Sequence, residues 1–283
     1  MLHIEDEKFQ TVADGEEISL GNKTLKFIYA PWVHWPDTMF TYVKEDNLLF
    51  TCDFLGSHSP FENLFAVETP ELLAGAKRYY AEIMMPFRNF CKKYVQKVKE
   101  MNVDMILTSH GPIYKNPNFI LDAYEKWTAD EVANEVVIPY VSMYESTKEM
   151  VDYMCEKLSD KGITVKPFNV VEEDLGELAM ELVDACTVVF GTSMVLAGPH
   201  PAAVSAAYLA GLLRPKAKFV SFIGSYGWGG VLTEKLEQAL SNVKAEKLEP
   251  VIIKGKPRED DFKKLDVLIE SIYNKHKELG LVN

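Results

Sequence analysis

Residues 135–150, EVVIPYVSMYESTKEM, contain a short apolar run, a turn rich in hydroxyl groups and the start of an amphipathic helix. The run EVVIPYV is typical of a strand inside a parallel sheet, because such strands are covered on both faces. SMYESTKEM then places Ser142, Ser146 and Thr147 where the helix begins. Amides and hydroxyls at a helix N-terminus suit a phosphate monoester, although simple capping of the helix would use the same residues.

The alternation of strand and helix continues from there to the end of the chain. Four further apolar runs are expected to be strands: ITVKPFNV (163–170), CTVVFGTS (186–193), KFVSFIGS (218–225) and KLEPVIIKG (247–255). Amphipathic stretches separate or follow them at 150–161, 176–185, 201–213, 233–242 and 262–280. Five strand–helix units predict a doubly wound parallel sheet of the α/β class.

Two more loops follow the third and fourth of these strands, at the edge where α/β sheets bind ligands. They are GTSMVLAGPHP (191–201) and GSYGWGG (224–230). Large apolar side chains between glycines are costly to expose to water, but they would form walls for a flat isoalloxazine ring. Local packing of the loops is the alternative. No Gly-rich fingerprint for NAD follows the first strand.

Residues of these three loops form the predicted cofactor site. Its residues are Ser142, Met143, Tyr144, Ser146, Thr147, Thr192, Ser193, Met194, Val195, Leu196, Gly198, Ser225, Tyr226, Gly227, Trp228 and Gly229.

The first part of the chain has a different pattern. TLKFIYAP (24–31) and NLLFTCDF (47–54) are bounded by turn residues and are expected to be neighbouring strands. A long helical pattern follows at 68–101, and Pro86 should break it.

A further strand and a connecting helix precede the second half. The strand is expected at DMILTSH (104–110), and the helix is expected at NPNFILDAYEKWTADEVAN (116–134). We therefore expect two domains, 1–133 and 134–283.

Three residues in the first domain have the chemistry of metal ligands. His34, Asp53 and His110 each lie at or just after an apparent strand. One carboxylate and two imidazoles suit iron, manganese or zinc, and an aspartate can bridge two ions while each histidine serves one. The alternatives are a histidine packed beside Trp35 and Pro36, an aspartate that caps a turn, and a histidine bonded to a nearby carbonyl.

The whole chain resembles the flavodiiron proteins (A-type flavoproteins), which join a metallo-β-lactamase-like diiron domain to a flavodoxin-like FMN domain. SMYESTKEM, GTSMVLAGPHP and GSYGWGG resemble the three FMN loops of that family, and HWPDTMF, CDFLGSH and TSHGPIY resemble its later metal-ligand segments. The resemblance implies that His34 and His110 are terminal iron ligands, that Asp53 is the bridge and that His58 has a supporting role. Glu145 departs from the family pattern, because a carboxylate near a phosphate is repulsive unless it turns outward.

The resemblance begins in the middle of the metal domain. The family's first ligand motif, His-x-Glu-x-Asp-His, should lie well upstream of His34, yet only 33 residues precede His34 and they contain just His3. The expected fold is thus an incomplete αββα metal domain followed by a flavodoxin-like five-stranded parallel sheet, with a diiron centre that this sequence alone cannot complete.

The resemblance also implies a function. It predicts an FMN-binding electron-transfer flavoprotein, a portion of an oxygen or nitric oxide reductase that passes electrons from FMN to a non-haem diiron site. Expected partners are a second copy packed head to tail, a redox donor such as rubredoxin or another reductase, and a separately encoded N-terminal half. The alternatives are a flavodoxin-like FMN carrier with a non-catalytic remnant metal domain, and an inactive fragment.

The apolar fraction of 47% is normal for a soluble globular protein. The net charge of −12, without clusters of basic and aromatic residues, disfavours nucleic acid as a partner. The stretch HIEDEKFQ after Met1 lacks a signal-peptide core, and no apolar run approaches the roughly 18–20 residues that span a bilayer, so a cytoplasmic location is expected. The four cysteines form no C-x-x-C pair, which argues against a zinc knuckle or an appended rubredoxin.

Overall fold

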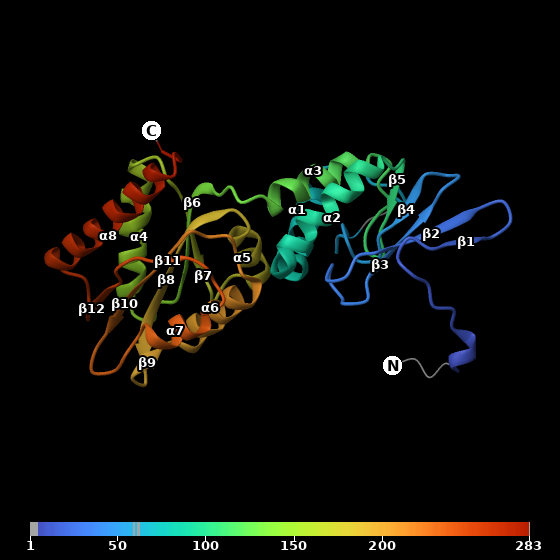
Figure 1. Ribbon diagram of the computed structural model, residues 1–283. Helices are drawn as coiled ribbons and strands as arrows, with labels where there is room; N and C mark the ends of the chain where they lie inside the picture. The colour runs from blue at the N-terminus through green and yellow to red at the C-terminus, as the bar shows by residue number, and fades with distance from the viewer. Residues whose placement is uncertain (1–4, 59, 61–62, 283) are drawn as a thin grey trace. The chain divides into compact units, whose positions relative to one another are not determined.

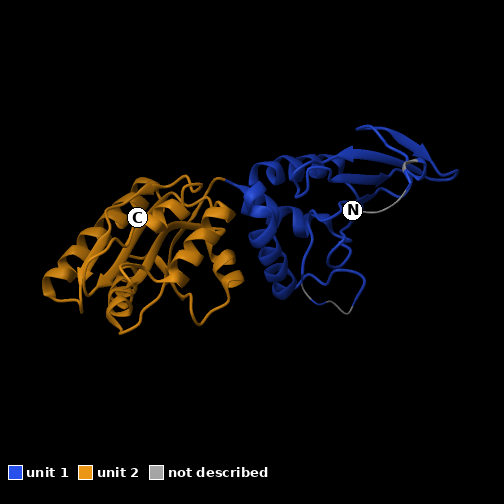
Figure 2. Ribbon diagram, turned by 90° about the horizontal axis from the view of Figure 1, so that it is seen from below, with its two compact units in different colours: residues 1–129 blue, residues 130–283 orange. Residues whose placement is uncertain are grey.

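The computed structural model describes residues 5–58, 60 and 63–282, and the chain divides into two compact units, 1–129 and 130–283 (Figure 2). The division lies slightly before the expected one at 133/134, since Ala133 already begins the first strand of the second unit. No helix within the described residues is both long and apolar enough to cross a membrane.

The first unit contains a five-stranded sheet in the order β1-β2-β3-β4-β5 (Figure 1). Its strands are β1 (Glu17–Ser19), β2 (Thr24–Tyr29), β3 (Met39–Val43), β4 (Leu48–Phe50) and β5 (Met105–Leu107). Neighbouring strands are antiparallel except β4 and β5, which pair in parallel.

The expectation that the runs at 24–31 and 47–54 are neighbouring strands is wrong. β3 lies between them and pairs with both β2 and β4. β3, MFTYV, has only five residues and pairs along both of its edges. Asn47 adopts the left-handed φ of 52° that closes the turn from β3 into β4.

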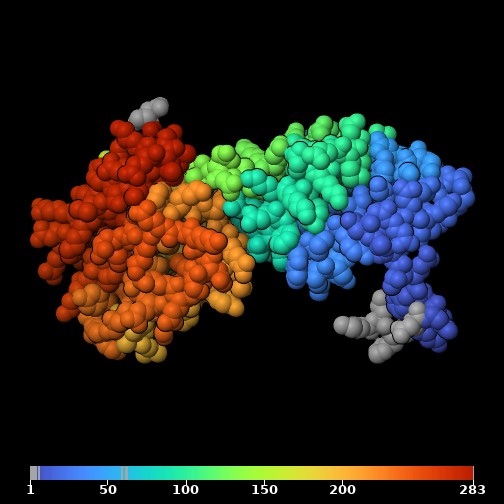
Figure 3. All heavy atoms as spheres, in the orientation of Figure 1, coloured from blue at the N-terminus to red at the C-terminus, as the bar shows by residue number. Residues whose placement is uncertain are grey.

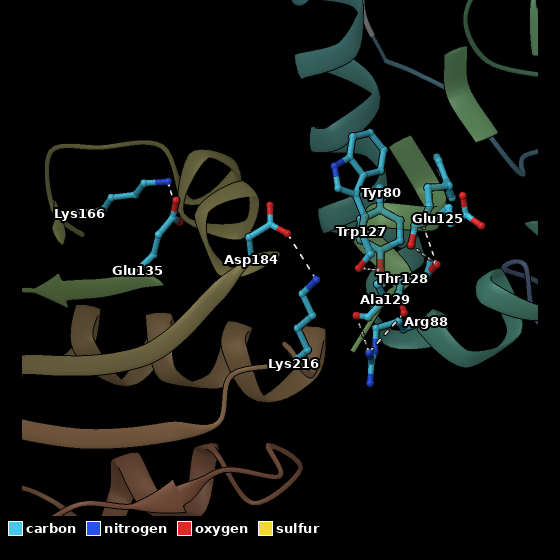
Figure 4. Close-up of polar contacts among 11 residues, drawn as sticks. Tyr80, Arg88, Glu125, Trp127, Thr128, Ala129, Glu135, Lys166, Asp184 and Lys216 are labelled. Carbon is cyan, nitrogen blue, oxygen red and sulfur yellow. Dashed lines mark hydrogen bonds and ion pairs between the residues drawn. The ribbon is translucent and has the colours of Figure 1, made fainter. Parts of the chain in front are cut away.

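Helices cover one face of this sheet. They are α1 (Pro70–Tyr79), α2 (Arg88–Met101) and α3 (Pro117–Thr128), whereas the short helix η1 (Asp6–Lys8) lies in the N-terminal segment that precedes β1. The break expected at Pro86 is present as a π turn, η2 (Tyr80–Met84), and a 3-10 turn, η3 (Met85–Phe87), between α1 and α2. Arg88 then donates hydrogen bonds to the carbonyls of Thr128 and Ala129, at 3.4 and 3.1 Å, and so fixes the end of α3 (Figure 4).

The two faces of the sheet in the first unit differ in exposure. Phe40 of β3 is fully buried and its ring meets Tyr94 of α2 at 5.8 Å. On the opposite face, Tyr29 and Phe50 are 45% and 42% exposed. Within the described residues, the helices therefore complete the core on one side of the sheet only.

The second unit is a doubly wound α/β sheet, as the sequence predicts. Its parallel strands run in the spatial order β7-β6-β8-β10, and β11 and β12 both lie on the outer side of β10. The strands are β6 (Ala133–Tyr140), β7 (Thr164–Asn169), β8 (Ala185–Val195), β10 (Phe219–Tyr226), β11 (Glu246–Lys247) and β12 (Val251–Lys254). This order is that of flavodoxin-like folds.

Helices pack on both faces of that sheet (Figure 1). They are α4 (Ser146–Asp160), α5 (Leu175–Leu182), α6 (Pro201–Leu213), α7 (Glu234–Ala239) and α8 (Glu259–Glu278). One buried cluster joins α4 and α8 to the sheet, and a second joins α5, α6 and α7 to the other face. In the space-filling view, α8 forms a flank of this unit (Figure 3).

The loop expected after the third strand is partly a β-hairpin. β8 continues to Val195 and returns as β9 (Gly198–Pro199), which pairs antiparallel with it. Leu196 and Ala197 form the two-residue turn and both have positive φ, 48° and 63°. That geometry matches the twist of flanking strands but is unusual for non-glycine residues, which is why the sequence did not predict it.

A buried histidine fastens α8 to the sheet. The ring of His276 has no exposed surface, and its Nε2 and Nδ1 lie 2.8 Å from Thr187 Oγ1 and 2.7 Å from Asn134 Oδ1. A neutral imidazole satisfies both contacts, because Nδ1–H donates to the amide oxygen and Nε2 accepts from the hydroxyl. Burial lowers the pKa of His276 to about 4.

We expect acid to weaken the second unit through His276. Between about pH 6.5 and pH 4 the unfolded chain binds a proton that the folded chain does not, so the free energy of unfolding falls as the pH falls. The loss at pH 4 should be on the order of 3 kcal/mol. Urea denaturation at several pH values, compared with His276→Gln, isolates this contribution. Parallel pH profiles for the two proteins would contradict it.

Candidate functional site

Three loops of the second unit meet at one edge of its sheet. They follow β6, β8 and β10, which are adjacent strands, and the register pairs Tyr140 with Gly191 and Ser193 with Ser225. Because the strands are parallel, their carboxyl ends lie side by side. The structure thus brings together the three segments in which the sequence predicts cofactor-binding residues.

Hydroxyl groups gather beside the N-terminus of α4. Thr147 Oγ1 and Ser225 Oγ are 3.4 Å apart, and Thr147 is fully buried. Ser193, the cross-strand neighbour of Ser225, has a buried hydroxyl oxygen without a hydrogen-bond partner in the described residues. An unsatisfied buried hydroxyl is costly, and a phosphate oxygen would satisfy it. The residues present therefore fit a phosphate monoester.

The first loop shows both capping and space for an anion. Ser142 Oγ accepts a hydrogen bond from the amide of Lys148 at 3.2 Å, so this hydroxyl acts as a helix cap here. Glu145 stands at the N-cap with φ of 65°, and its exposed side chain makes no capping bond. Its carboxylate is therefore not fixed against the amides at the start of α4.

The outer walls of this site are apolar and exposed. Tyr144, Leu196 and Trp228 are 86%, 89% and 68% exposed. The second and third loops also touch each other, because a side chain at Gly230 would come within 2.4 Å of the Ala197 carbonyl oxygen. Exposed aromatic and aliphatic side chains around a glycine-rich gap suit a planar ligand.

The remaining predicted residues divide by environment. Thr192 is buried and bonded within its own loop, where its hydroxyl donates to the Ser193 carbonyl and accepts from the His200 amide. Gly227 and Gly229 border open space. Exposed or partly exposed are Met143, Ser146, Met194, Val195 and Tyr226, whereas Gly198 is buried.

The predicted metal residues of the first unit also lie together. His34 Nε2 is 3.5 Å from Asp53 Oδ2, and His110 Nε2 is 3.3 Å from Asp53 Oδ1. Each oxygen of one carboxylate thus faces a different imidazole, the arrangement that a bridging aspartate requires. Within the described chain no three His, Cys, Asp or Glu side chains converge on one point, so each oxygen–imidazole pair would need further ligands.

Backbone contacts between two loops hold these side chains. The amide of Ser109 donates to the Cys52 carbonyl at 2.8 Å, and the amide of Ser57 donates to the His110 carbonyl at 3.0 Å. Cys52 and Leu55, on either side of Asp53, have left-handed φ values of 54° and 69°. Such conformations are concentrated at functional sites, where surrounding contacts offset their cost.

Tyr79, at the end of α1, contacts the predicted metal residues and was not predicted from the sequence. Its hydroxyl donates to the Asp53 carbonyl at 2.9 Å, and its ring is 4.7 Å from His58 and 6.0 Å from His110. Burial, with the nearby Asp53 charge, raises the pKa of Tyr79. No local pattern distinguishes it from the other aromatic residues of that helical stretch.

Sequence comparisons match both units of this chain to known proteins. Residues 1–111 match the family described as ODP family beta lactamase. A nitric oxide reductase of Moorella thermoacetica is 35% identical over 268 residues, which are 92% of this chain and 67% of that protein.

Solved structures cover both units. The rubredoxin oxygen:oxidoreductase of Desulfovibrio gigas matches with a TM-score of 0.91 at 27% identity, over 98% of this chain and 71% of that one. A variant of the flavo di-iron protein of Thermotoga maritima matches with a TM-score of 0.81 at 27% identity, over 94% of this chain and 67% of that one. The chain spans about two thirds of each of these longer proteins.

Proposed function

This chain belongs to the flavodiiron protein family, and we propose that it binds FMN and passes electrons from it to a non-haem diiron site, as part of an oxygen or nitric oxide reductase. The observation that carries the proposal is the Asp53 carboxylate, whose two oxygens face two different histidines. FMN can exchange electrons one at a time, and a pair of irons can bind O₂ or NO and share electrons across a bridge.

The three loops of the second unit would hold FMN. The hydroxyls of Thr147, Ser193 and Ser225 and the first amides of α4 would bind its phosphate, because hydroxyls and a helix N-terminus together can share a dianion without a lysine. Trp228 and Leu196 would exclude water from the ring and fix its plane.

The first unit would hold iron through His34, Asp53 and His110. Further ligands are needed, since the described side chains supply only one imidazole to each carboxylate oxygen. The half-exposed sheet face that carries Tyr29 and Phe50 offers an apolar surface on which the polypeptide that bears these ligands could pack. The ligand requirement is the same for further ligands on the same polypeptide and for ligands on a separately encoded one.

Two further partners belong to this proposal. A second copy packed head to tail would bring the FMN of one subunit to the metal residues of the other, and a rubredoxin or another reductase would deliver electrons. The relatives named rubredoxin oxygen:oxidoreductase and nitric oxide reductase support such a donor and such substrates.

The alternative is an FMN electron carrier in which the first unit no longer binds metal. The incomplete ligand set favours it, because two ligands for each ion are fewer than iron, zinc or manganese sites ordinarily use.

A cofactor count on the purified chain tests the proposal. We expect one FMN per chain by absorbance after extraction, together with iron by elemental analysis when the remaining ligands are supplied. FMN without metal under those conditions would favour the carrier, and absence of FMN would overturn both functions.

A further inference from the structure

We propose that the loop after β12, residues 254–258, is a fourth loop of the FMN site, in which Lys256 neutralises a carboxylate beside the bound phosphate. This inference rests on the proposed binding of FMN, and it names a positioning residue outside the three predicted loops. The segment has the sequence KGKPR, so it carries three cationic side chains in a chain whose net charge is −12.

The pairing of β12 places this loop at the same edge of the sheet as the other three. β12 lies parallel to β10, with Lys254 opposite Tyr226 (Figure 1). The amide of Gly255 donates to the Tyr226 carbonyl at 2.8 Å, so the two strands stay together up to the loop. Because parallel strands end at one edge, the loop begins beside the end of β10 that carries Ser225, whose hydroxyl is 3.4 Å from that of Thr147.

A carboxylate in the first turn of α4 lies close to the predicted phosphate position. It belongs to Glu149, whose amide donates to the Glu145 carbonyl at 2.8 Å. Negative charge in this turn is favourable for the helix dipole, but it repels a bound dianion. Lys148 is directed elsewhere, since its ammonium is 2.6 Å from Asp152, one turn further along α4.

Lys256 faces this carboxylate from the fourth loop. Its Nζ is 3.3 Å from Glu149 Oε2, so the ion pair joins the loop after β12 to the start of α4. The Lys256 side chain is 75% exposed and that of Glu149 is 38% exposed, and ion pairs this accessible contribute little to stability. The pair therefore acts mainly on the charge of the site, where the hydroxyl of Ser193, which is only 8% exposed, has no partner within the described residues.

The test compares the affinity of the full chain for FMN and for riboflavin, which has the same ring but no phosphate. We expect Lys256→Gln to bind FMN about 3–10-fold more weakly at low ionic strength, because an uncompensated carboxylate then faces the dianion, and to bind riboflavin as before. The difference should disappear at about 1 M salt, where the screening length is about 3 Å. Flavin fluorescence measures both affinities.

Two further variants separate the charge from the side chain. Replacement of Glu149 and Lys256 together by glutamine keeps the local charge at zero, so it should restore the FMN affinity of the unaltered chain. Lys247→Gln is the matched control, because Lys247 Nζ is 2.7 Å from Glu237 Oε1 but lies opposite Val220, near the other end of β10. It should bind FMN as the unaltered chain does. Far-UV circular dichroism establishes that all variants are folded.

The results that overturn the assignment differ from those that overturn FMN binding. If the unaltered chain prefers FMN to riboflavin and Lys256→Gln keeps the same FMN affinity, the fourth loop alone is wrong. Equal weakening of FMN and riboflavin in that variant would also overturn it, because the effect would then not involve the phosphate. If the unaltered chain binds neither flavin, the proposed FMN site is wrong and the role of Lys256 is lost with it.

Discussion

Asp53→Ala is expected to remove metal binding while leaving FMN binding unchanged. The carboxylate of Asp53 provides the oxygen that faces each imidazole, at 3.3 and 3.5 Å, so one substitution disables both halves of the site. The loss of affinity should be at least about 100-fold, because outer partners of metal ligands alone contribute about 10–100-fold. Competition against a chromogenic chelator, with the remaining metal ligands supplied, would measure this loss, and flavin fluorescence would follow FMN affinity.

Asp37→Ala is the control for this substitution. Asp37 lies in the same segment as His34 but is exposed, and it forms no ion pair in the part of the chain that the structure describes. Its loss should leave metal affinity unaltered. A folded Asp53→Ala protein that had also lost FMN would show that the two sites are not independent.

Joint replacement of Trp228 and Met194 by alanine is expected to weaken FMN binding by roughly 30-fold or more. Stacking of a ring on an aromatic side chain contributes about 1–3 kcal/mol, and loss of about 2 kcal/mol corresponds to that factor. Met194 lies in the β8–β9 hairpin and Trp228 in the loop after β10, both at the carboxyl edge of the sheet, and Trp228 is 68% exposed. Metal uptake should not change.

Tyr208→Ala separates this effect from the loss of any exposed aromatic residue. Tyr208 is 59% exposed on α6, outside the three loops. We expect it to bind FMN as the unaltered chain does. Unchanged affinity in the Trp228/Met194 double variant would mean that the loops do not hold the ring.

The sequence predicted the second unit well because its elements are locally specified. Buried parallel strands are continuous apolar runs, and the helices between them are amphipathic. Each strand and each helix can therefore be predicted from its own residues. The three metal residues were predicted because each lies at or just after an apparent strand, which places side chains at a sheet edge. Their mutual contacts depend on the pairing of β4 with β5, which no local pattern shows.

The features that the sequence did not predict depend on tertiary contacts. β3 has only five residues and depends on pairing with both β2 and β4, and the hairpin after β8 requires left-handed backbone at Leu196 and Ala197, which lack the usual glycine signal. Tyr79 contacts the Asp53 carbonyl only because α1 packs against the loop of Asp53.

The parallel pairing of β4 with β5 has a consequence for the order in which the molecule assembles. Both strands are short, and the chain between them contains α1 and α2, so Asp53 meets His110 only after a long loop has closed. Contacts of this kind form late and slow the folding of a domain. The amides of Ser57 and Ser109, which join the two loops, should therefore exchange their hydrogens together. A bound ion would make that shared opening rarer, since binding is linked to the closed form alone.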